Sequence, residues 1–439
     1  MLEKKYGLWT TIAMVIGIVI GSGVFFKADN VLEASGGSVK IALLAWLTGA
    51  ISMIFGALVF AECSNRFEKS NGIVDYAESI ISEKFAYLIG WFNAIIYYPA
   101  LAAVLAWVAA NYTCILLNKK GDFLWILAII YILGIYLINY LSPILSGKFQ
   151  IFSTVIKLIP LILIAFLGLL KGMTSGVLVN NFYEVTKKLA TGNNFAAAVL
   201  STAFAYEGWI IATTINSEIK DSKKTLPKAL VLGSLSVVII YILYFLGIVG
   251  IIPTQTILKQ GDTAVSLAAS TIFGNFGASL LTAFIVISCL GTLNGLILGG
   301  SRGFYSLAMR GQGLKPNFFS KIHKKTNMPT NSAMANLFLV FVFLLVWYMN
   351  FQGLFPNKLF IDISELPIAL IYGIYIIIYI KYMFVMKDLS ITKRFVIPFL
   401  AFIGAIIVVY GGLSKPSVII DFGISIFIFL SGLLFYKKN

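Results

Sequence analysis

The chain has 439 residues, of which 59% are hydrophobic and only 12% are charged. A soluble domain carries about 25% charged residues, and a chain with a mean hydropathy of +0.93 has too few polar groups to cover a soluble surface. These values exclude a soluble enzyme, a disordered chain and a disulfide scaffold. They indicate a polytopic membrane protein, whose net charge of +15 is better explained by basic cytoplasmic loops than by nucleic acid binding.

Twelve segments are long and apolar enough to cross a bilayer, which takes about 20 residues. They are residues 8–34, 39–65, 85–117, 122–143, 148–171, 193–217, 227–252, 276–308, 330–349, 359–381, 394–412 and 416–436. The stretch 262–275 is shorter and less apolar, which favours a re-entrant or interfacial helix. The sequence therefore predicts an all-α protein with twelve transmembrane helices. We expect its N-terminal apolar segment to be the first of them, not a cleaved signal peptide.

The distribution of basic residues predicts the orientation. With both termini in the cytoplasm, about twice as many Lys and Arg residues fall on the inner side as on the outer side. Inner loops of membrane proteins carry this excess. We therefore expect a multi-pass protein of the cytoplasmic membrane with both termini inside.

Two of the spans are interrupted in the same way. The first contains IVIGSGVFF at residues 18–26, and the sixth contains FAYEGW at residues 204–209. Interrupted helices at matching positions of two halves are typical of inverted-repeat transporters and mark their binding site. The sequence predicts a first repeat over residues 1–171 and a second over residues 193–381, with residues 394–439 outside the repeats.

Each break offers backbone groups that suit an amino acid. The N–H groups that open a half-helix suit a carboxylate, and the candidates are those of Ser22, Gly23 and Val24. The carbonyls that end a half-helix suit an ammonium, and the candidates are those of Val19, Ile20, Phe204 and Ala205. Phe204 adjoins the break and could also cover a bound substrate.

Helix packing is the alternative explanation of the first break. Gly17 and Gly21 form a GxxxG pattern, which lets two helices approach closely. That pattern does not explain Gly23 or the matching break in the sixth span. We therefore favour binding over packing at these two positions.

Lys157 is an ionisable residue that the sequence places near the middle of the membrane. It follows Lys148 by nine positions, which puts it about 14 Å deep at 1.5 Å per residue. A charge at that depth is by default functional. Its ammonium could replace a coupling sodium ion near the first break, or it could take and release a proton.

Two further polar positions are candidates with weaker signals. Glu207, in the second break, could bond to backbone or water, pair with a cation, or line the route to the site. In the eighth span Gly291, Gly295, Gly299 and Gly303 form a smooth face that favours packing. Ser288 lies on the same span and could reach a cavity in a coupling or gating role.

No cofactor or metal site is expected. The single histidine, His323, lies in a basic loop, and the three cysteines, Cys63, Cys114 and Cys289, are far apart. These residues build neither a metal-ligand cluster nor a catalytic triad inside the membrane. An enzyme is therefore not expected, and a purely structural subunit would leave both helix breaks unexplained.

Several motifs in order resemble one known superfamily. They are IGSGVFFK, GALVFAECSNRFEKSNGIVDYAE, PALAAVLA, Lys157, FAYEGW with NSEIKDSKKTLPKAL, and SCLGTLNGLILGGSRGFYSLAMRG. The chain resembles the amino acid–polyamine–organocation superfamily and, within it, the L-type amino acid transporter family. The resemblance implies a LeuT-type fold of five plus five inverted-repeat helices with two additional helices.

The same resemblance implies a function and roles for particular residues. The function is sodium-independent exchange of small neutral amino acids such as alanine, serine, threonine and cysteine by alternating access. In that family the backbone matching Gly21, Ser22 and Gly23 holds the substrate carboxylate, Phe204 matches a gate, and Lys157 stands in for sodium.

The chain also departs from the family pattern. It has Asn71-Gly72 where two glycines are common, and Glu207 where Asp or Gly is common, so a cationic amino acid or a polyamine remains an alternative substrate. A proton-coupled symporter using Lys157 is another alternative. The short segment between the third and fourth spans has no cysteine, so we expect no disulfide-linked glycoprotein partner.

Overall fold

The computed structural model describes residues 6–21, 23–67, 72–141, 143–183, 192–211, 213, 219–323, 326, 328–355, 361–414 and 416–437. Within these residues the chain is a bundle of helices, and nine of them are long and apolar enough to cross a membrane. Shorter apolar helices at Leu8–Val19 and Phe422–Phe435 add to these nine. The all-α fold predicted from the sequence is confirmed.

The first half runs from α1 to α10. Its elements are α1 (Leu8–Val19), α2 (Gly23–Phe26), α3 (Ala28–Ala34), α4 (Val39–Arg66), α5 (Ile73–Ile80), α6 (Glu83–Phe92), η1 (Asn93–Tyr97), α7 (Tyr98–Leu117), α8 (Phe123–Leu141), α9 (Pro143–Ser175) and α10 (Val177–Tyr183). The third span is thus α6, the π-helical turn η1 and α7 in succession.

The second half contains the remaining spans and their connections. Its elements are α11 (Gly192–Tyr206), α12 (Ser222–Ile251), α13 (Thr254–Gln260), η3 (Gly261–Thr263), α14 (Ala264–Ser301), α15 (Gly303–Ala308), α16 (Pro316–Phe319), α17 (Thr330–Phe351), α18 (Leu366–Val385), η5 (Thr392–Val396), α19 (Ile397–Leu413), α20 (Pro416–Ser431) and η6 (Gly432–Phe435).

Two helices begin earlier than their apolar segments predict. α9 begins at Pro143 rather than at residue 148, and α12 begins at Ser222 rather than at residue 227. The apolar part of a sequence predicts the part of a helix that lies in the hydrocarbon core of the bilayer. A membrane helix can extend beyond that core into the headgroup region and the water. Lys157 lies near the middle of α9, as it does in the predicted segment.

The segment expected to be a separate short helix forms the first part of α14. Gly274 breaks that helix with φ 68° and ψ −179°, a conformation that side chains rarely adopt. The residues before this kink follow η3, and the residues after it form the eighth span. The stretch 262–275 is therefore a distinct helical segment, as predicted.

The glycine face of the eighth span packs against two neighbours. A Cβ atom at Gly291 would lie 2.1 Å from the Ser153 side chain of α9, and one at Gly299 would lie 2.7 Å from Tyr98 of α7. The packing explanation of this face is confirmed. α14 therefore packs closely on both α9 and α7.

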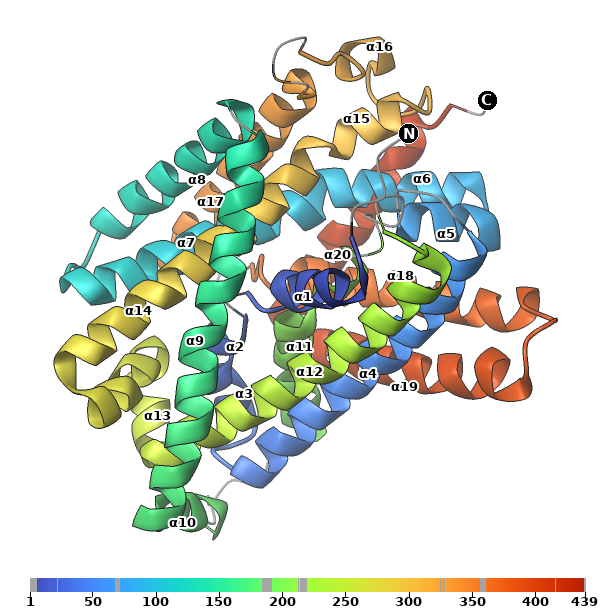
Figure 1. The fold of residues 1–439 in the computed structure, drawn as a ribbon. Coiled ribbons are helices and arrows are strands. Elements are labelled where there is room, and N and C mark those ends of the chain that lie inside the picture. Colours follow the sequence, from blue (N-terminus) through green and yellow to red (C-terminus); the bar gives the residue numbers. More distant parts are fainter. Residues whose placement is uncertain are drawn as a thin grey trace.

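The arrangement surrounds the first span with other helices. Figure 1 shows α1 near the centre of the view, with α9 passing on one side and α12 and α4 on the other. In the helical stretch Glu83–Leu117, which contains α6 and α7, 72% of the residues of the apolar span are buried inside the protein. In α8 the corresponding share is 22%. α7 is thus a central helix and α8 a peripheral one that presents apolar side chains outward.

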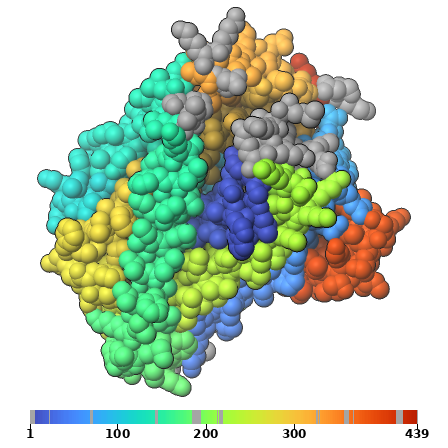
Figure 2. Space-filling model, viewed as in Figure 1, coloured from blue at the N-terminus to red at the C-terminus, as the bar shows by residue number. Residues whose placement is uncertain are grey.

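Part of α1 reaches the surface. In the space-filling view its side chains are visible between α9 and α12 (Figure 2), and Trp9 is 80% exposed. The other end of the first span is enclosed, since Phe25 is 2% exposed and Ala28 is 6% exposed. The two half-helices of this span therefore have different surroundings on the two sides of the break.

Candidate functional site

The first helix break lies where the GSG motif predicts it. α1 ends at Val19, Ile20 is extended with ψ 97°, and the next helix begins at Gly23. Ser22, one of the predicted carboxylate donors, lies outside the described residues. Gly23 and Val24 open α2, where backbone N–H groups have no partner in their own helix.

The second break interrupts the sixth span after α11. The helix ends at Tyr206, and Glu207 and Gly208 form a turn. Gly208 has φ +106°, which a residue with a side chain rarely adopts. The glycine of the EGW sequence is therefore required by the backbone of this turn.

The two breaks contact each other directly. A Cβ atom at Gly23 would lie only 2.6 Å from the Cα atom of Ala205, and one at Gly208 would lie 3.4 Å from the carbonyl oxygen of Ile18. Glycine at position 23 thus lets the two half-helices touch through their backbones. Residues far apart in the sequence come together at one place, as their matching breaks predict.

Tyr241 of α12 joins the two breaks through its hydroxyl group. The hydroxyl lies 3.2 Å from the carbonyl oxygen of Val19 and 3.2 Å from that of Ala205, and it can donate to either. The side chain is fully buried. The sequence analysis missed this residue because a tyrosine in an apolar helix carries no signal of its partners.

Lys157 binds the first break from α9. Its Nζ atom donates to the carbonyl oxygens of Gly17 at 2.7 Å and Ile20 at 2.6 Å, and the side chain is fully buried. The lysine therefore caps the end of α1, where helix carbonyls lack intrahelical partners. This contact places the amine beside the first break, as both functions considered for it require.

Ser288 also bonds to the first break. Its hydroxyl donates to the carbonyl oxygen of Gly21 at 3.3 Å, and the residue is buried in α14. Thr292 lies one turn further on, 3.0 Å from where a Cβ atom of Gly21 would be. The eighth span thus contacts the first break at Gly21.

The carbonyl groups predicted to face an ammonium already accept hydrogen bonds. Val19 and Ala205 accept from Tyr241, Ile20 accepts from Lys157, and Phe204 accepts from the N–H of Glu207 at 3.3 Å. A carbonyl oxygen has two lone pairs. The carbonyls of Val19, Ile20 and Ala205 can therefore each accept a further hydrogen bond.

Glu207 lies among tyrosines on the other side of the second break. Its Oε1 atom accepts from the hydroxyl of Tyr97 at 3.0 Å and from that of Tyr375 at 3.3 Å. Its Oε2 atom is buried and has no hydrogen-bond partner among the described residues. A carboxylate oxygen in that position needs a donor, which a ligand or water would supply.

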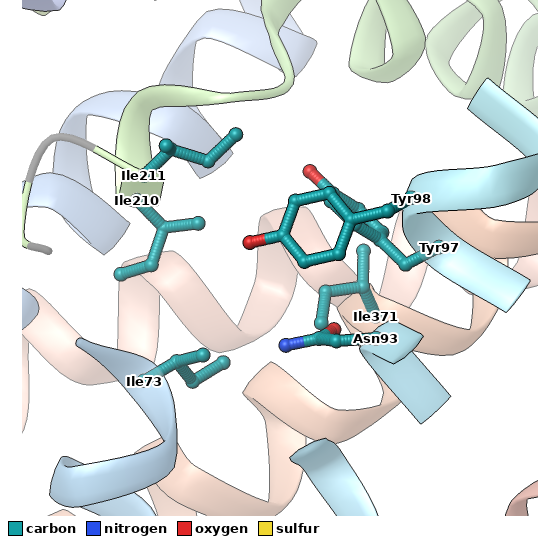
Figure 3. Close-up of a pocket in the computed structure, with 7 residues that line it drawn as sticks. All are labelled: Ile73, Asn93, Tyr97, Tyr98, Ile210, Ile211 and Ile371. Carbon is teal, nitrogen blue, oxygen red and sulfur yellow. The ribbon is translucent and has the colours of Figure 1, made fainter. Parts of the chain in front are cut away.

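A small cavity lies near this carboxylate, and Tyr97, which donates to Glu207, forms part of its lining. Figure 3 shows Tyr97, Tyr98 and Asn93 extending from one side toward Ile210 and Ile211 on the other. Ile73 of α5 and Ile371 of α18 complete the lining. Because Ile210 and Ile211 follow α11 and the break, this cavity lies beyond the breaks along the sixth span.

Comparison with known proteins identifies similar sequences over almost the whole chain. A family described as amino acid permease matches residues 6–435. The chain is 32% identical to the serine/threonine exchanger SteT of Bacillus subtilis (strain 168), over 99% of this chain and 96% of that protein.

Human transporters are also similar, at lower identity. The cystine/glutamate transporter of Homo sapiens is 28% identical over 78% of this chain and 68% of its own length. The large neutral amino acids transporter small subunit 2 of Homo sapiens is 28% identical over 83% of this chain and 69% of its own length.

Proposed function

The chain belongs to the amino acid permease family of the amino acid–polyamine–organocation superfamily, and from this we propose that it exchanges small neutral amino acids by alternating access. Its relatives are named as transporters and exchangers, so it is an amino acid transporter and not an enzyme. The LeuT-type fold comes with the family, and the all-α bundle agrees with it. The division into repeats at residues 1–171 and 193–381, with residues 394–439 added, stays a prediction.

One observation supports the binding site most strongly. Two interrupted helices meet so closely that Gly23 and Ala205 leave no room for a side chain between them. A backbone with free N–H groups and carbonyl acceptors at that point suits both charged groups of an amino acid. We place the substrate carboxylate at the N–H groups of Ser22, Gly23 and Val24, with Gly21 in the same turn. The ammonium is assigned to the carbonyls of Val19, Ile20, Phe204 and Ala205.

The proposed cycle needs no covalent chemistry. The carboxylate and ammonium bind both breaks at once, so binding favours the state in which the half-helices close around the ligand. Phe204 covers the site, Lys157 keeps the end of α1 in place and Ser288 supports the turn at Gly21. In this scheme no residue forms a covalent bond with the substrate, so the substrate leaves unchanged on the other side.

Glu207 supports a second candidate, in which the substrate side chain carries a donor. Its unpartnered Oε2 atom can accept from a hydroxyl or an ammonium but not from a methyl group. This favours serine or threonine over alanine, and it extends the candidates to cationic amino acids and polyamines. In a competition assay, Glu207→Gln would then reduce inhibition by a cationic amino acid more than inhibition by alanine.

The function can be tested with purified protein in sodium-free liposomes. Uptake of radiolabelled serine and alanine is measured with and without unlabelled amino acid inside, at equal pH on both sides. Exchange predicts uptake only when amino acid is present inside, and liposomes without protein give the background. Uptake into empty vesicles that increases on external acidification would replace exchange with proton symport through Lys157.

The orientation is part of the proposal. We place both termini in the cytoplasm of the cell because that arrangement puts most basic residues inside. The residues beyond the first break, from Gly23 to Ala34, then face outward, and the cavity beyond the second break faces the cytoplasm. We also expect no disulfide-linked partner, since Cys63, Cys114 and Cys289 are all buried.

A further inference from the structure

A buried polar cluster lies on the outward side of the two breaks. We call it the Lys27 cluster, after its central residue. The Nζ atom of Lys27 lies 3.4 Å from Oε1 of Glu365 and donates to the hydroxyl of Ser364 at 3.1 Å. The same Glu365 oxygen accepts from the hydroxyl of Ser201 at 3.2 Å, and the Lys27 ammonium lies 5.1 Å from the ring centroid of Phe204.

The cluster joins three elements that the chain brings together from distant positions. Lys27 separates α2 from α3 in the half of the first span beyond its break. Ser201 and Phe204 lie on α11, in the half of the sixth span before its break. Glu365 directly precedes α18.

The ion pair is shielded from solvent. The side chains of Lys27 and Glu365 are 5% and 2% exposed, and Phe204 is 7% exposed. The ammonium lies over the aromatic ring, an arrangement that attracts the cation more strongly when water is excluded. In this state the pair therefore fixes the position of Phe204, one residue before the Ala205 carbonyl of the proposed site.

A buried ion pair suits a contact that must open repeatedly. Two buried charges gain attraction but lose hydration, so the closed pair is only slightly favoured over separated, hydrated charges. Removing one partner takes away the attraction that holds the two elements together, while the cost of burying the remaining charge is kept. The remaining charge regains its full hydration only when the elements move apart and water enters.

We propose that the ion pair between Lys27 and Glu365 is an outer latch, which closes the external path to the substrate site and holds Phe204 in place. This inference rests on the proposed transport function. Lys27 is a positioning residue in this scheme, since it acts on the substrate through Phe204. Opening of the latch lets α3 and α11 separate while the cytoplasmic side is closed.

The test measures opening of the external path without measuring transport. Val31 lies on α3, is fully buried, and its N–H bonds to the Lys27 carbonyl at 2.9 Å, so Val31→Cys places a thiol beside the latch. The protein is held in lipid nanodiscs, where both faces are accessible, and reacted with a hydrophilic maleimide. The reaction rate is compared with that of the parent protein, whose native cysteines are buried.

Loss of either charge should expose the reporter. We expect Lys27→Gln and Glu365→Gln, each in the Val31→Cys protein, to raise the labelling rate roughly tenfold by shifting the population toward the open state. The exchanged pair, Lys27→Glu with Glu365→Lys, should return the rate to within about threefold of the Val31→Cys protein. Lys171→Gln is the matched control, because Lys171 bonds to the Thr271 carbonyl and not to the cluster.

Equal labelling in all these proteins would overturn the latch. Should Lys27→Gln fail to give monodisperse protein, Glu365→Gln carries the same test with an isosteric side chain. The wild-type protein is assayed for exchange in parallel. If the wild-type protein shows no exchange but the charge variants are labelled faster as expected, the proposed function is contradicted and the latch is not. If the wild-type protein exchanges amino acids but all the variants are labelled at the same rate, the latch alone is contradicted.

Discussion

Lys157 shows how one buried side chain can organise a backbone that lacks regular hydrogen bonds. Its amine donates hydrogen bonds to two carbonyl oxygens at the end of α1, those of Gly17 and Ile20. The same carbonyls would otherwise be buried without partners, which is costly in a membrane protein. The residue therefore links the shape of the first break to the position of α9.

We expect Lys157→Ala to slow exchange by about tenfold or more while changing substrate affinity less than about threefold, because hydrogen bonds to a charged group contribute roughly 1.5–3 kcal/mol each. The loss falls mainly on the conformational step, since Lys157 bonds to the end of α1 and shares only the Ile20 carbonyl with the proposed ligand positions. Exchange rate and equilibrium binding of serine are measured on the same preparation. Lys148→Ala, an exposed position on the same helix, is the control, and equal exchange by both variants would contradict this role.

Tyr241→Phe removes the single hydroxyl that joins the two breaks. The carbonyls of Val19 and Ala205 would then be left buried without this donor, at a cost of about 1–3 kcal/mol. We expect weaker serine binding and a lower melting temperature. Tyr244→Phe is the matched control on the same helix, because the buried Tyr244 hydroxyl has no partner among the described residues. Similar losses in both variants would show that the bridge is unimportant.

Contacts between elements depend on where glycine allows backbones to meet. Gly23 packs on Ala205 where the two broken spans cross, and Gly168 and Gly172 of α9 meet Gly247 and Gly250 of α12 in the same way. Close backbone approach is a common way to pack membrane helices. The crossing of the broken spans differs because it leaves acceptor and donor groups available.

Gly23→Ala should disrupt this crossing. The new Cβ atom would lie 2.6 Å from the Cα atom of Ala205, and such overpacking costs about 1–3 kcal/mol. We expect loss of serine binding and a reduced melting temperature in detergent. Gly134→Ala on α8, where nothing lies within 4 Å of the new atom, should leave both unchanged. Normal binding by Gly23→Ala would mean that the breaks do not need to touch.

Much of this arrangement could be predicted from the sequence, and the limit has a physical cause. The GSG and EGW motifs predicted both breaks, because glycine and polar residues are costly inside a membrane helix unless they have a purpose. Lys157 was predicted to be functional because a charge at its depth is costly, and one of the two roles considered for it placed its ammonium near the first break. The partners Tyr241 and Glu365 were not predicted, since their contacts depend on how distant helices pack. In the sequence, Lys27 is only a basic residue that follows a helix break. The periodicity of the sequence does not predict that its side chain is buried inside the bundle.

At the scale of the whole molecule, charged contacts distinguish the two ends of the bundle. The pair of Lys27 and Glu365 is buried on the side beyond the first break. At the other end Arg310 pairs with Asp75 and, at 3.5 Å, with Glu78 of α5, and its side chain is 22% exposed. The ion pair at one end is thus buried, whereas the one at the other end is partly exposed to solvent.

The proposed orientation predicts which loops an external reagent reaches. Lys119 lies between α7 and α8, Lys387 lies between α18 and η5, and both are exposed. In intact cells, a membrane-impermeant maleimide should label Lys119→Cys and should label Lys387→Cys only after the membrane is permeabilised. The reverse pattern would invert the orientation and would place the Lys27 cluster on the cytoplasmic side.

The fixed position of Lys157 has an electrical consequence. An ammonium that stays bonded to the end of α1 does not travel across the bilayer, and a zwitterionic amino acid adds no net charge as it crosses. Moving one elementary charge through 100 mV changes the free energy by about 2.3 kcal/mol. The exchange of one zwitterion for another moves no net charge across the membrane. Under the proposed exchange of neutral amino acids, the membrane voltage neither drives nor opposes transport, and the concentrations of amino acids on the two sides alone decide its direction.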